Sequence, residues 1–292
     1  MSGPASAPEM DVRNPAVAGT FYPSGAAELS AAVDASYTHR LGPGALPSVG
    51  GTFKGLKACV CPHAGYAYSG PVAAHSYLDV SRMARPALVV ILGPNHYGLG
   101  AGVASYGQGV WETPLGRVEV DAAATAELEG LSGVVEVDRE AHRREHSIEV
   151  QLPFLQRLYG RFTLLPVSLA LQDKSTARSL GKALAEMLRP AADGETDAVL
   201  VASSDLTHYE PASRARDKDL ALLRHVEALD VDSFYSTLGR MEITACGYGA
   251  IASVMEACRL MGMRGRVNAY HNSGEVTGDY EAVVGYPSVS FA

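Results

Sequence analysis

The sequence predicts one α/β domain with a central mixed or mostly parallel sheet and helices on both of its faces. Apolar runs of strand length alternate with segments of helical periodicity, which is typical of such domains. The run ALVVIL at 87–92 is continuous and β-branched, as in a strand buried on both faces. No composition change or long linker divides 11–292, so we expect a single domain there. The small and polar residues 1–10 are expected to form a disordered tail.

The elements follow one another in a regular order along the chain. Strands are predicted at 56–61, 87–92, 162–169, 198–202, 266–270 and 282–289. Helices are predicted at 70–80, 121–131, 147–159, 175–188, 212–229, 231–238 and 249–261. Asp121 is expected to cap its helix, because a carboxylate there accepts hydrogen bonds from the free amides of the first turn.

Composition and charge exclude several classes of protein. The hydrophobic fraction of 47% is enough for a large core, and the formal net charge is −8 with 32 acidic and 24 basic residues. Because no long basic run is present, we expect no nucleic-acid partner. No segment has the length of a membrane span or the pattern of a signal peptide, so we expect a cytoplasmic protein without a membrane partner. Four scattered cysteines do not form a disulfide framework.

Three histidines follow predicted buried strands. The segments CPHAGYAYSG (61–70), GPNHYG (93–98) and SSDLTHY (203–209) place His63, His96 and His208 within a few residues of a strand end. Ligands of such sheets bind at the carboxyl ends of the strands. A single histidine in a loop is more often a structural side chain, but three at equivalent positions predict a shared site.

Cys246 is the cysteine with a predicted chemical role. It lies in ITACGYGA, directly before the apolar helix expected from Gly249. The positive end of a helix dipole lowers the pKa of a thiol, and the thiolate is the form that binds metal. The flanking glycines, Gly247 and Gly249, would allow another backbone or a ligand to approach closely. Cys61 shares a strand face with His63, but we expect a core position for it.

The segment 141–155, AHRREHSIEVQLPFL, carries a second group of polar residues. Glu145 and Glu149 are one helical turn apart, and so are His142 and His146 if the helix begins early enough. The HExxH signature of zinc proteases is absent. We expect Glu145, His146 and Glu149 to line a pocket or to support its ligands. For His142 a solvated helical turn is an equal alternative.

Other chemical signatures are weak or missing. No G-x-S-x-G elbow, phosphate-binding loop or dinucleotide fingerprint occurs. Ser203, Asp205 and His208 lie too close together on one loop to predict a catalytic triad. Trp111 and the tyrosines beside the histidines fit either a pocket wall or ordinary packing.

Motifs over essentially the whole chain after residue 11 resemble those of the Memo family. That family includes the eukaryotic protein Memo and the prokaryotic AmmeMemoRadiSam system protein B, and it is similar in fold to class III extradiol dioxygenases. Several motifs in the same order are far more specific than any one of them. The matching segments are VRNPAVAGTFYP, PHAGYAYSG, ILGPNHYG, WETPLG, EHSIEVQLPFL, SSDLTHY, ACGYGA and YHNSGEVTGDYEAVVGY.

The resemblance implies a site of two histidines and a cysteine, His63, His96 and Cys246, that holds one metal ion. Fe(II) is the expected ion, with copper or zinc as alternatives. The resemblance also implies that Asp205 and His208 lie in the pocket, with His208 as acid or base, and it adds His146 to this set. Cys246 stands where the dioxygenases have a carboxylate, which argues against ordinary ring cleavage.

Three functions remain open at the level of sequence. The first is an iron- or copper-dependent redox enzyme or oxygenase acting on an unidentified small molecule or peptide. The second is a metal- or partner-binding protein without turnover, with AMMECR-type and radical-SAM partners implied by the family name. The third is a zinc hydrolase in which Glu145 or His208 activates water.

Overall fold

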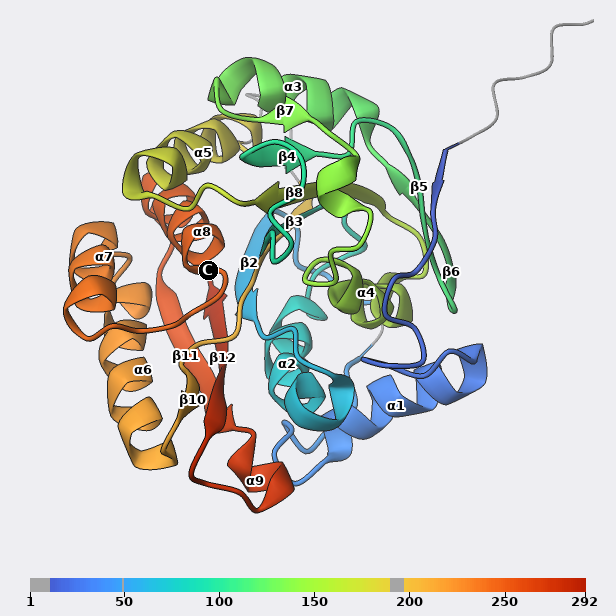
Figure 1. Cartoon of the computed structure of the whole chain (residues 1–292). Helices are drawn as coiled ribbons and strands as arrows, with labels where there is room; N and C mark the ends of the chain where they lie inside the picture. Colours follow the sequence, from blue (N-terminus) through green and yellow to red (C-terminus); the bar gives the residue numbers. More distant parts are fainter. Residues whose placement is uncertain (1–10, 49, 190–196) are drawn as a thin grey trace, which may run out of the picture.

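The computed structural model describes residues 11–48, 50–189 and 197–292, so the tail predicted at 1–10 lies outside them. A central sheet crosses the molecule and helices cover both of its faces (Figure 1). Five neighbouring strands in its middle run parallel, and antiparallel strands extend it on either side. The predicted α/β class with a mixed, mostly parallel sheet is therefore confirmed.

The strands form the order β1-β5-β6-β8-β3-β9-β2-β12-β10, with β11 paired to β12 and β4 to β7 and β8. The parallel group is β6-β8-β3-β9-β2, and β12 joins β2 in antiparallel orientation. Their bounds are β1 Val12–Arg13, β2 Leu56–Cys61, β3 Leu88–Pro94, β4 Val103–Ser105, β5 Gly109–Thr113, β6 Gly116–Val120, β7 Glu136–Val137, β8 Thr163–Leu169, β9 Ala198–Ser203, β10 His208–Glu210, β11 Gly265–Asn272 and β12 Val283–Phe291.

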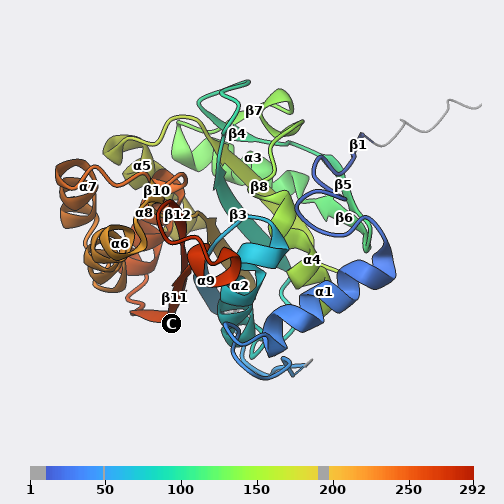
Figure 2. The same cartoon turned by 60° about the horizontal axis from the view of Figure 1, so that its bottom comes forward.

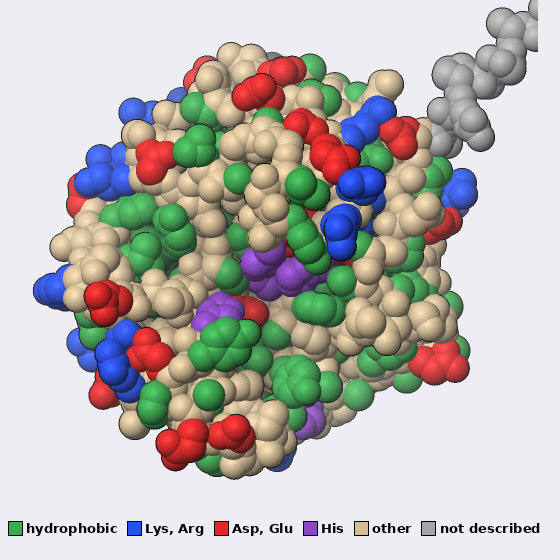
Figure 3. Space-filling model, viewed as in Figure 1, with side chains coloured by type: hydrophobic (Ala, Val, Ile, Leu, Met, Phe, Trp, Pro, Cys, Tyr) green, Lys and Arg blue, Asp and Glu red, His purple; other side chains and the backbone are tan. Residues whose placement is uncertain are grey.

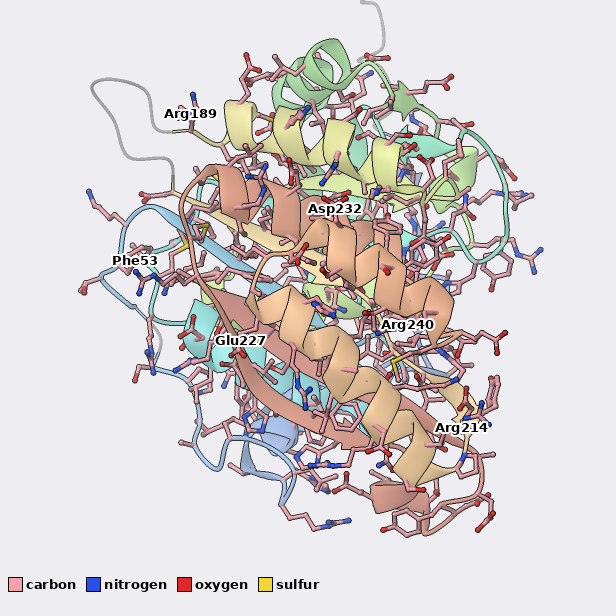
Figure 4. All side chains as sticks on the ribbon, turned by 90° about the vertical axis from the view of Figure 1, so that its left-hand side faces the viewer. Phe53, Arg189, Arg214, Glu227, Asp232 and Arg240 are labelled. Atoms are coloured by element: carbon pink, nitrogen blue, oxygen red, sulfur yellow. The ribbon has the colours of Figure 1, made fainter. Side chains whose placement is uncertain are left out.

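The helices form two layers, and Figure 4 looks onto the side formed by α6, α7 and α8, with Arg214 on α6 and Arg240 on α7. None of the described helices is long and apolar enough to cross a bilayer. Their bounds are α1 Ala26–Thr38, α2 Tyr66–Val80, α3 Ala122–Ser132, α4 Leu152–Tyr159, α5 Lys174–Met187, α6 Ala212–Glu227, α7 Val231–Arg240, α8 Tyr248–Leu260 and α9 Gly274–Thr277, with 3-10 turns η1 at Glu140–His142 and η2 at Glu149–Gln151.

The central strands are apolar without interruption because both of their faces are buried. Along β3, Val89 and Ile91 join one cluster with side chains of α1, α2 and α4. Val90 and Leu92 point the opposite way and join the cluster that contains α3, α5 and α8. This alternation places one hydrophobic core on each face of the sheet.

Most predicted elements occur within a few residues of their expected bounds. Asp121 caps α3 as expected, because its carboxylate accepts the amide of Ala124 at 2.9 Å. The helix predicted at 147–159 begins later, since η2 precedes α4 and the segment before it is not helical. There the carboxylate of Glu145 accepts the backbone amides of His146 and Ser147, which draws both amides away from helical hydrogen bonds.

Several elements were not predicted from the sequence. They include the 13-residue helix α1, the hairpin of β5 and β6, and the two-residue strands β1 and β7. Strands this short carry little periodicity, and β1 and β7 pair with strands that are distant in the sequence. One of them, β1, matters for the candidate site.

Candidate metal centre

The predicted histidines lie at one edge of the sheet. His63 and His96 come two residues after the ends of β2 and β3, and Asp205 comes two residues after β9. Because β9 lies between β3 and β2, these three strand ends are adjacent. Figure 3 shows histidine side chains gathered near the centre of this face.

The structure brings His63, His96 and Cys246 together. One ligand atom from each lies within 4.8 Å of the others. The rings of the two histidines are 5.2 Å apart between centroids and nearly perpendicular. Since metal bonds to nitrogen and sulfur are about 2.0–2.3 Å long, a small adjustment would let all three atoms share one ion.

Ser203 fixes the tautomer of His63. The Ser203 hydroxyl donates its only proton to the carbonyl of Ser147 at 2.6 Å and accepts the side-chain amide of Gln151 at 2.8 Å. Its remaining contact, Nδ1 of His63 at 2.9 Å, must therefore donate. Nε2 of His63 is left unprotonated and lies 3.1 Å from Sγ of Cys246. Burial lowers the pKa of His63 well below its ordinary value, so the imidazole is neutral and able to bind metal.

Glu145 does the same for His96 with a charged acceptor. Its carboxylate accepts Nδ1 of His96 at 2.9 Å and the His96 backbone amide at 2.6 Å. Burial alone would raise the pKa of Glu145, but the hydrogen bonds from His96 and from the amide of Ser147 lower it below its usual range. A carboxylate on Nδ1 leaves Nε2 free and strengthens the imidazole as a ligand.

Cys246 is held where α8 begins. Its Sγ accepts the backbone amide of Asp205 at 3.3 Å, and Gln172 donates to its carbonyl at 2.9 Å. The close approach expected at Gly247 is confirmed, because a Cβ there would clash with the carbonyl oxygen of Ser203. The expected lowering of the thiol pKa is wrong for this structure. Burial, reinforced by the charge of Asp205, raises the pKa of Cys246, so a cation is needed to favour the thiolate.

Asp205 and His208 lie beside this group without joining it. The carboxylate of Asp205 accepts the backbone amide of His63 at 2.8 Å, and burial raises its pKa to about 6. His208 is held by Thr244, which accepts its Nδ1 at 2.9 Å through the carbonyl and its amide at 2.8 Å through the hydroxyl. Nε2 of His208 is therefore an unprotonated nitrogen in the neutral ring.

His146 lies against His96. Its ring stacks on that of His96 at 4.7 Å with 16° between the planes, and Phe21 packs on it at 4.5 Å. Burial lowers the pKa of His146 to about 4, against the opposing charge of Glu145. His146, His96 and Glu145 form a second group within 4.8 Å, but the Glu145 carboxylate is already engaged by four hydrogen bonds. In this second group, Glu145 and His146 hold the ring of His96 in place through the hydrogen bond and the stacking contact.

The structure corrects the prediction for the rest of the 141–155 segment. His142 is buried, contacts the carbonyl of Ala104 at 3.1 Å and packs edge-on against Trp111. Glu149 is fully buried and pairs with Arg13 at 2.7 Å. Neither joins the group of His63, His96 and Cys246, and Trp111 is a core residue. The condition for a shared helix face of His142 and His146, an early start of the helix, is not met, because no helix covers 143–148.

Several supporting residues were missed from the sequence. Ser203 contacts His63, Gln151 contacts Ser203 and Gln172 contacts Cys246, each across 52 or more positions. Gln151 carries a weak signal, as a lone amide within the apolar run VQLPFL. Arg13 gives no local signal at all.

The match to known proteins covers nearly the whole chain. A family model described as Memo-like protein matches residues 13–290. The chain belongs to the Memo family. A MEMO1 family protein of Aeropyrum pernix is 48% identical over 282 residues, covering 96% of this chain and 99% of the relative. A MEMO1 family protein of Methanopyrus kandleri is 44% identical, with 96% and 98% covered.

A solved structure supports the fold. An uncharacterized protein of Escherichia coli K12 superposes with a TM-score of 0.51 and 14% identity, covering 80% of this chain and 98% of the other. At that identity the likeness concerns the fold alone.

Proposed function

We propose that this Memo-family protein binds one metal ion through Nε2 of His63, Nε2 of His96 and Sγ of Cys246. The observation that carries the proposal is the contact that Nδ1 of each imidazole makes with an oxygen that has no proton left to donate, from which it follows that Nδ1 donates and Nε2 is free. Two imidazoles and one thiolate suit Fe(II), copper or zinc. Fe(II) is our first choice, and the soft thiolate makes copper and zinc strong competitors.

We further propose that the site serves a redox enzyme or oxygenase acting on an unidentified substrate. A bound iron or copper ion would supply one-electron and oxygen chemistry. His208 supports this function, because its Nδ1 is committed to the Thr244 carbonyl and its Nε2 can accept a proton. Asp205 would hold the loop of His63 in place through the 2.8 Å amide contact. The cytoplasmic location expected from the sequence is part of this proposal.

A metal- or partner-binding role without turnover is the second candidate. It is favoured by the exposed rings of Tyr97 and Tyr209, which follow His96 and His208 directly and are 47% and 77% exposed. Exposed aromatic side chains are enriched where proteins bind partners. AMMECR-type and radical-SAM proteins are the partners we would test first. A zinc hydrolase is third, since Glu145 is fully engaged by hydrogen bonds and His208 would have to serve as its base.

The metal site is tested by its content of metal after anaerobic purification. We expect His63→Ala, His96→Ala and Cys246→Ala each to lose most of the bound metal. His39→Ala and Cys258→Ala are the controls, because they remove the same side-chain types away from the three ligands and should keep it. Full retention of metal in all three ligand variants would contradict the site.

Oxygen uptake with and without catechols then separates the functions. Substrate-dependent uptake that is lost in His208→Ala supports the oxygenase. An iron-loaded protein that consumes no oxygen with any catechol favours the binding role. A protein that holds only zinc and hydrolyses esters or amides favours the hydrolase.

A further inference from the structure

The N-terminal segment 12–22, here called the strap, is joined by hydrogen bonds to the segments that carry Glu145 and His63. Its first residues, Val12–Arg13, form β1 and pair in parallel with β5. The strap then passes α4 and leads into α1 (Figure 2). A short bridge between Ala18 and Tyr22 closes its end.

All three nitrogens of the Arg13 guanidinium donate hydrogen bonds to the segment 142–149, which carries Glu145. Nε donates to the carbonyl of His142 at 2.8 Å, and Nη2 donates to the carbonyl of Glu145 at 2.5 Å. Nη1 donates to the carboxylate of Glu149 at 2.7 Å. The side chain is 4% exposed and also lies over the ring of Trp111. Three fixed donors on three acceptors define the path of this loop.

Glu149 accepts further hydrogen bonds from the strap. Besides Arg13, its carboxylate accepts the amides of Ala16 at 2.8 Å and Val17 at 3.1 Å and the hydroxyl of Tyr22 at 2.6 Å. A buried ion pair is costly when its hydrogen-bonding capacity is left unused, and here four donors satisfy the carboxylate. The strap and the 142–149 loop therefore form one hydrogen-bonded unit.

The far end of the strap reaches the other histidine ligand. The carbonyl of Phe21 accepts the amide of Tyr66 at 2.8 Å, three residues after His63. The ring of Phe21 packs on His146, which stacks on His96. The strap thus contacts the loops of both histidines without supplying a ligand.

We propose that the strap positions the metal centre and that Arg13 is its positioning residue. Arg13 fixes the backbone of Glu145, and the Glu145 carboxylate in turn orients His96. If that backbone moves by about an ångström, the 2.9 Å bond to Nδ1 is lost and the His96 ring is free to turn. This inference rests on the proposed metal site.

The first test titrates the full-length, metal-free protein with Co(II), whose absorption reports thiolate coordination and geometry. Arg13→Lys keeps the charge, but a single nitrogen cannot reach three acceptors. We expect its Kd for Co(II) to rise about 10–100-fold, as for loss of a group that orients a metal ligand. Arg139→Ala is the control, since it breaks the ion pair with Asp11 at the same end of the chain and leaves Glu145 untouched.

A double-mutant cycle tests whether Arg13 acts through Glu145. If it does, adding Arg13→Lys to Glu145→Gln weakens Co(II) binding less than about twofold further, whereas independent effects would multiply. An Arg13→Lys protein with a lower Tm but wild-type Kd and spectrum overturns the proposal, because its role is then only structural. If the wild-type protein shows no thiolate coordination of Co(II), the proposed metal site itself is contradicted, and the inference about Arg13 fails with it.

A milder variant serves if Arg13→Lys does not fold. Tyr22→Phe removes one of the four donors to Glu149 and adds no charge. We expect a smaller weakening of Co(II) binding with the same spectral change. A Kd for Co(II) equal to that of the wild-type protein would contradict the proposed positioning role of the strap.

Discussion

The loops after β2 and β3 each present a histidine to the same point, yet they hold it by different means. His63 is 2% exposed and is fixed by the neutral hydroxyl of Ser203, which is itself held by Gln151. The His96 side chain is 31% exposed and is fixed by the carboxylate of Glu145. The tautomer is the same in both cases.

Burial determines which kind of hydrogen-bond acceptor each imidazole needs. A buried imidazole is kept neutral by its surroundings, so a neutral acceptor is enough for His63. His96 faces solvent, where water competes for Nδ1, and a carboxylate makes a stronger hydrogen bond than a hydroxyl. We therefore expect metal binding to depend more on Glu145 than on Ser203.

Glu145→Gln is expected to weaken metal binding more than any other change to the supporting groups of the two loops. The amide can still accept Nδ1–H, but the negative charge that strengthens His96 as a ligand is lost. We expect metal affinity to fall by about 10–100-fold in a competition titration with a chelator. Glu140→Gln is the control, because Glu140 lies in the same region and pairs with exposed Arg143. Equal affinities of the two variants would contradict the comparison.

Ser203→Ala is expected to weaken binding by about tenfold, at the lower end for such supporting groups. Nδ1 of His63 loses its acceptor, so the ring is less firmly held. Ser168→Ala offers a matched control on β8, since the Ser168 hydroxyl is buried without a hydrogen-bond partner in the described part of the chain. A larger loss for Ser203→Ala than for Glu145→Gln would reverse our interpretation of the two loops.

Asp219→Asn is expected to leave metal affinity unchanged and to alter stability with pH. Asp219 holds the loop of His208 by accepting the hydroxyl of Thr207 at 2.6 Å and that of Tyr270 at 2.8 Å. Burial raises its pKa from 3.8 to about 6. The folded protein thus binds the proton more tightly than the unfolded chain, so this group favours folding most at low pH. That contribution is lost as the pH rises from about 4 to 6.

Urea unfolding of wild type and Asp219→Asn, from about pH 3.5 to about pH 7.5, measures this contribution to the free energy of unfolding. Between about pH 4 and pH 6, the free energy of unfolding of the variant should rise relative to that of wild type by on the order of 2–3 kcal/mol. A constant difference between the two proteins across the range would show that Asp219 does not titrate as its burial implies.

The buried strands and the polar residues that follow them could be predicted from the amino-acid sequence. ALVVIL and AVLVA are strands because apolar β-branched runs of this length fit a sheet covered on both faces, and that property is local. The positions of His63 and His96 just beyond such runs predicted their meeting, since parallel strands end at one edge. Cys246 depended on the family resemblance, because a free cysteine is commonly a small buried apolar side chain whether or not a helix follows it.

The groups that hold His63, His96 and Cys246 in place become apparent only in the folded chain. The neighbourhood of β3, β9 and β2 depends on strand order, which no single segment encodes. Glu145 reaches His96 across 49 positions, Ser203 reaches His63 across 140, and Arg13 reaches Glu145 across 132. The direction of a hydrogen bond, and hence the tautomer of each histidine, exists only once these distant groups are packed together. Burial, which raises the pKa of Cys246 against the helix dipole, is likewise a property of the folded chain.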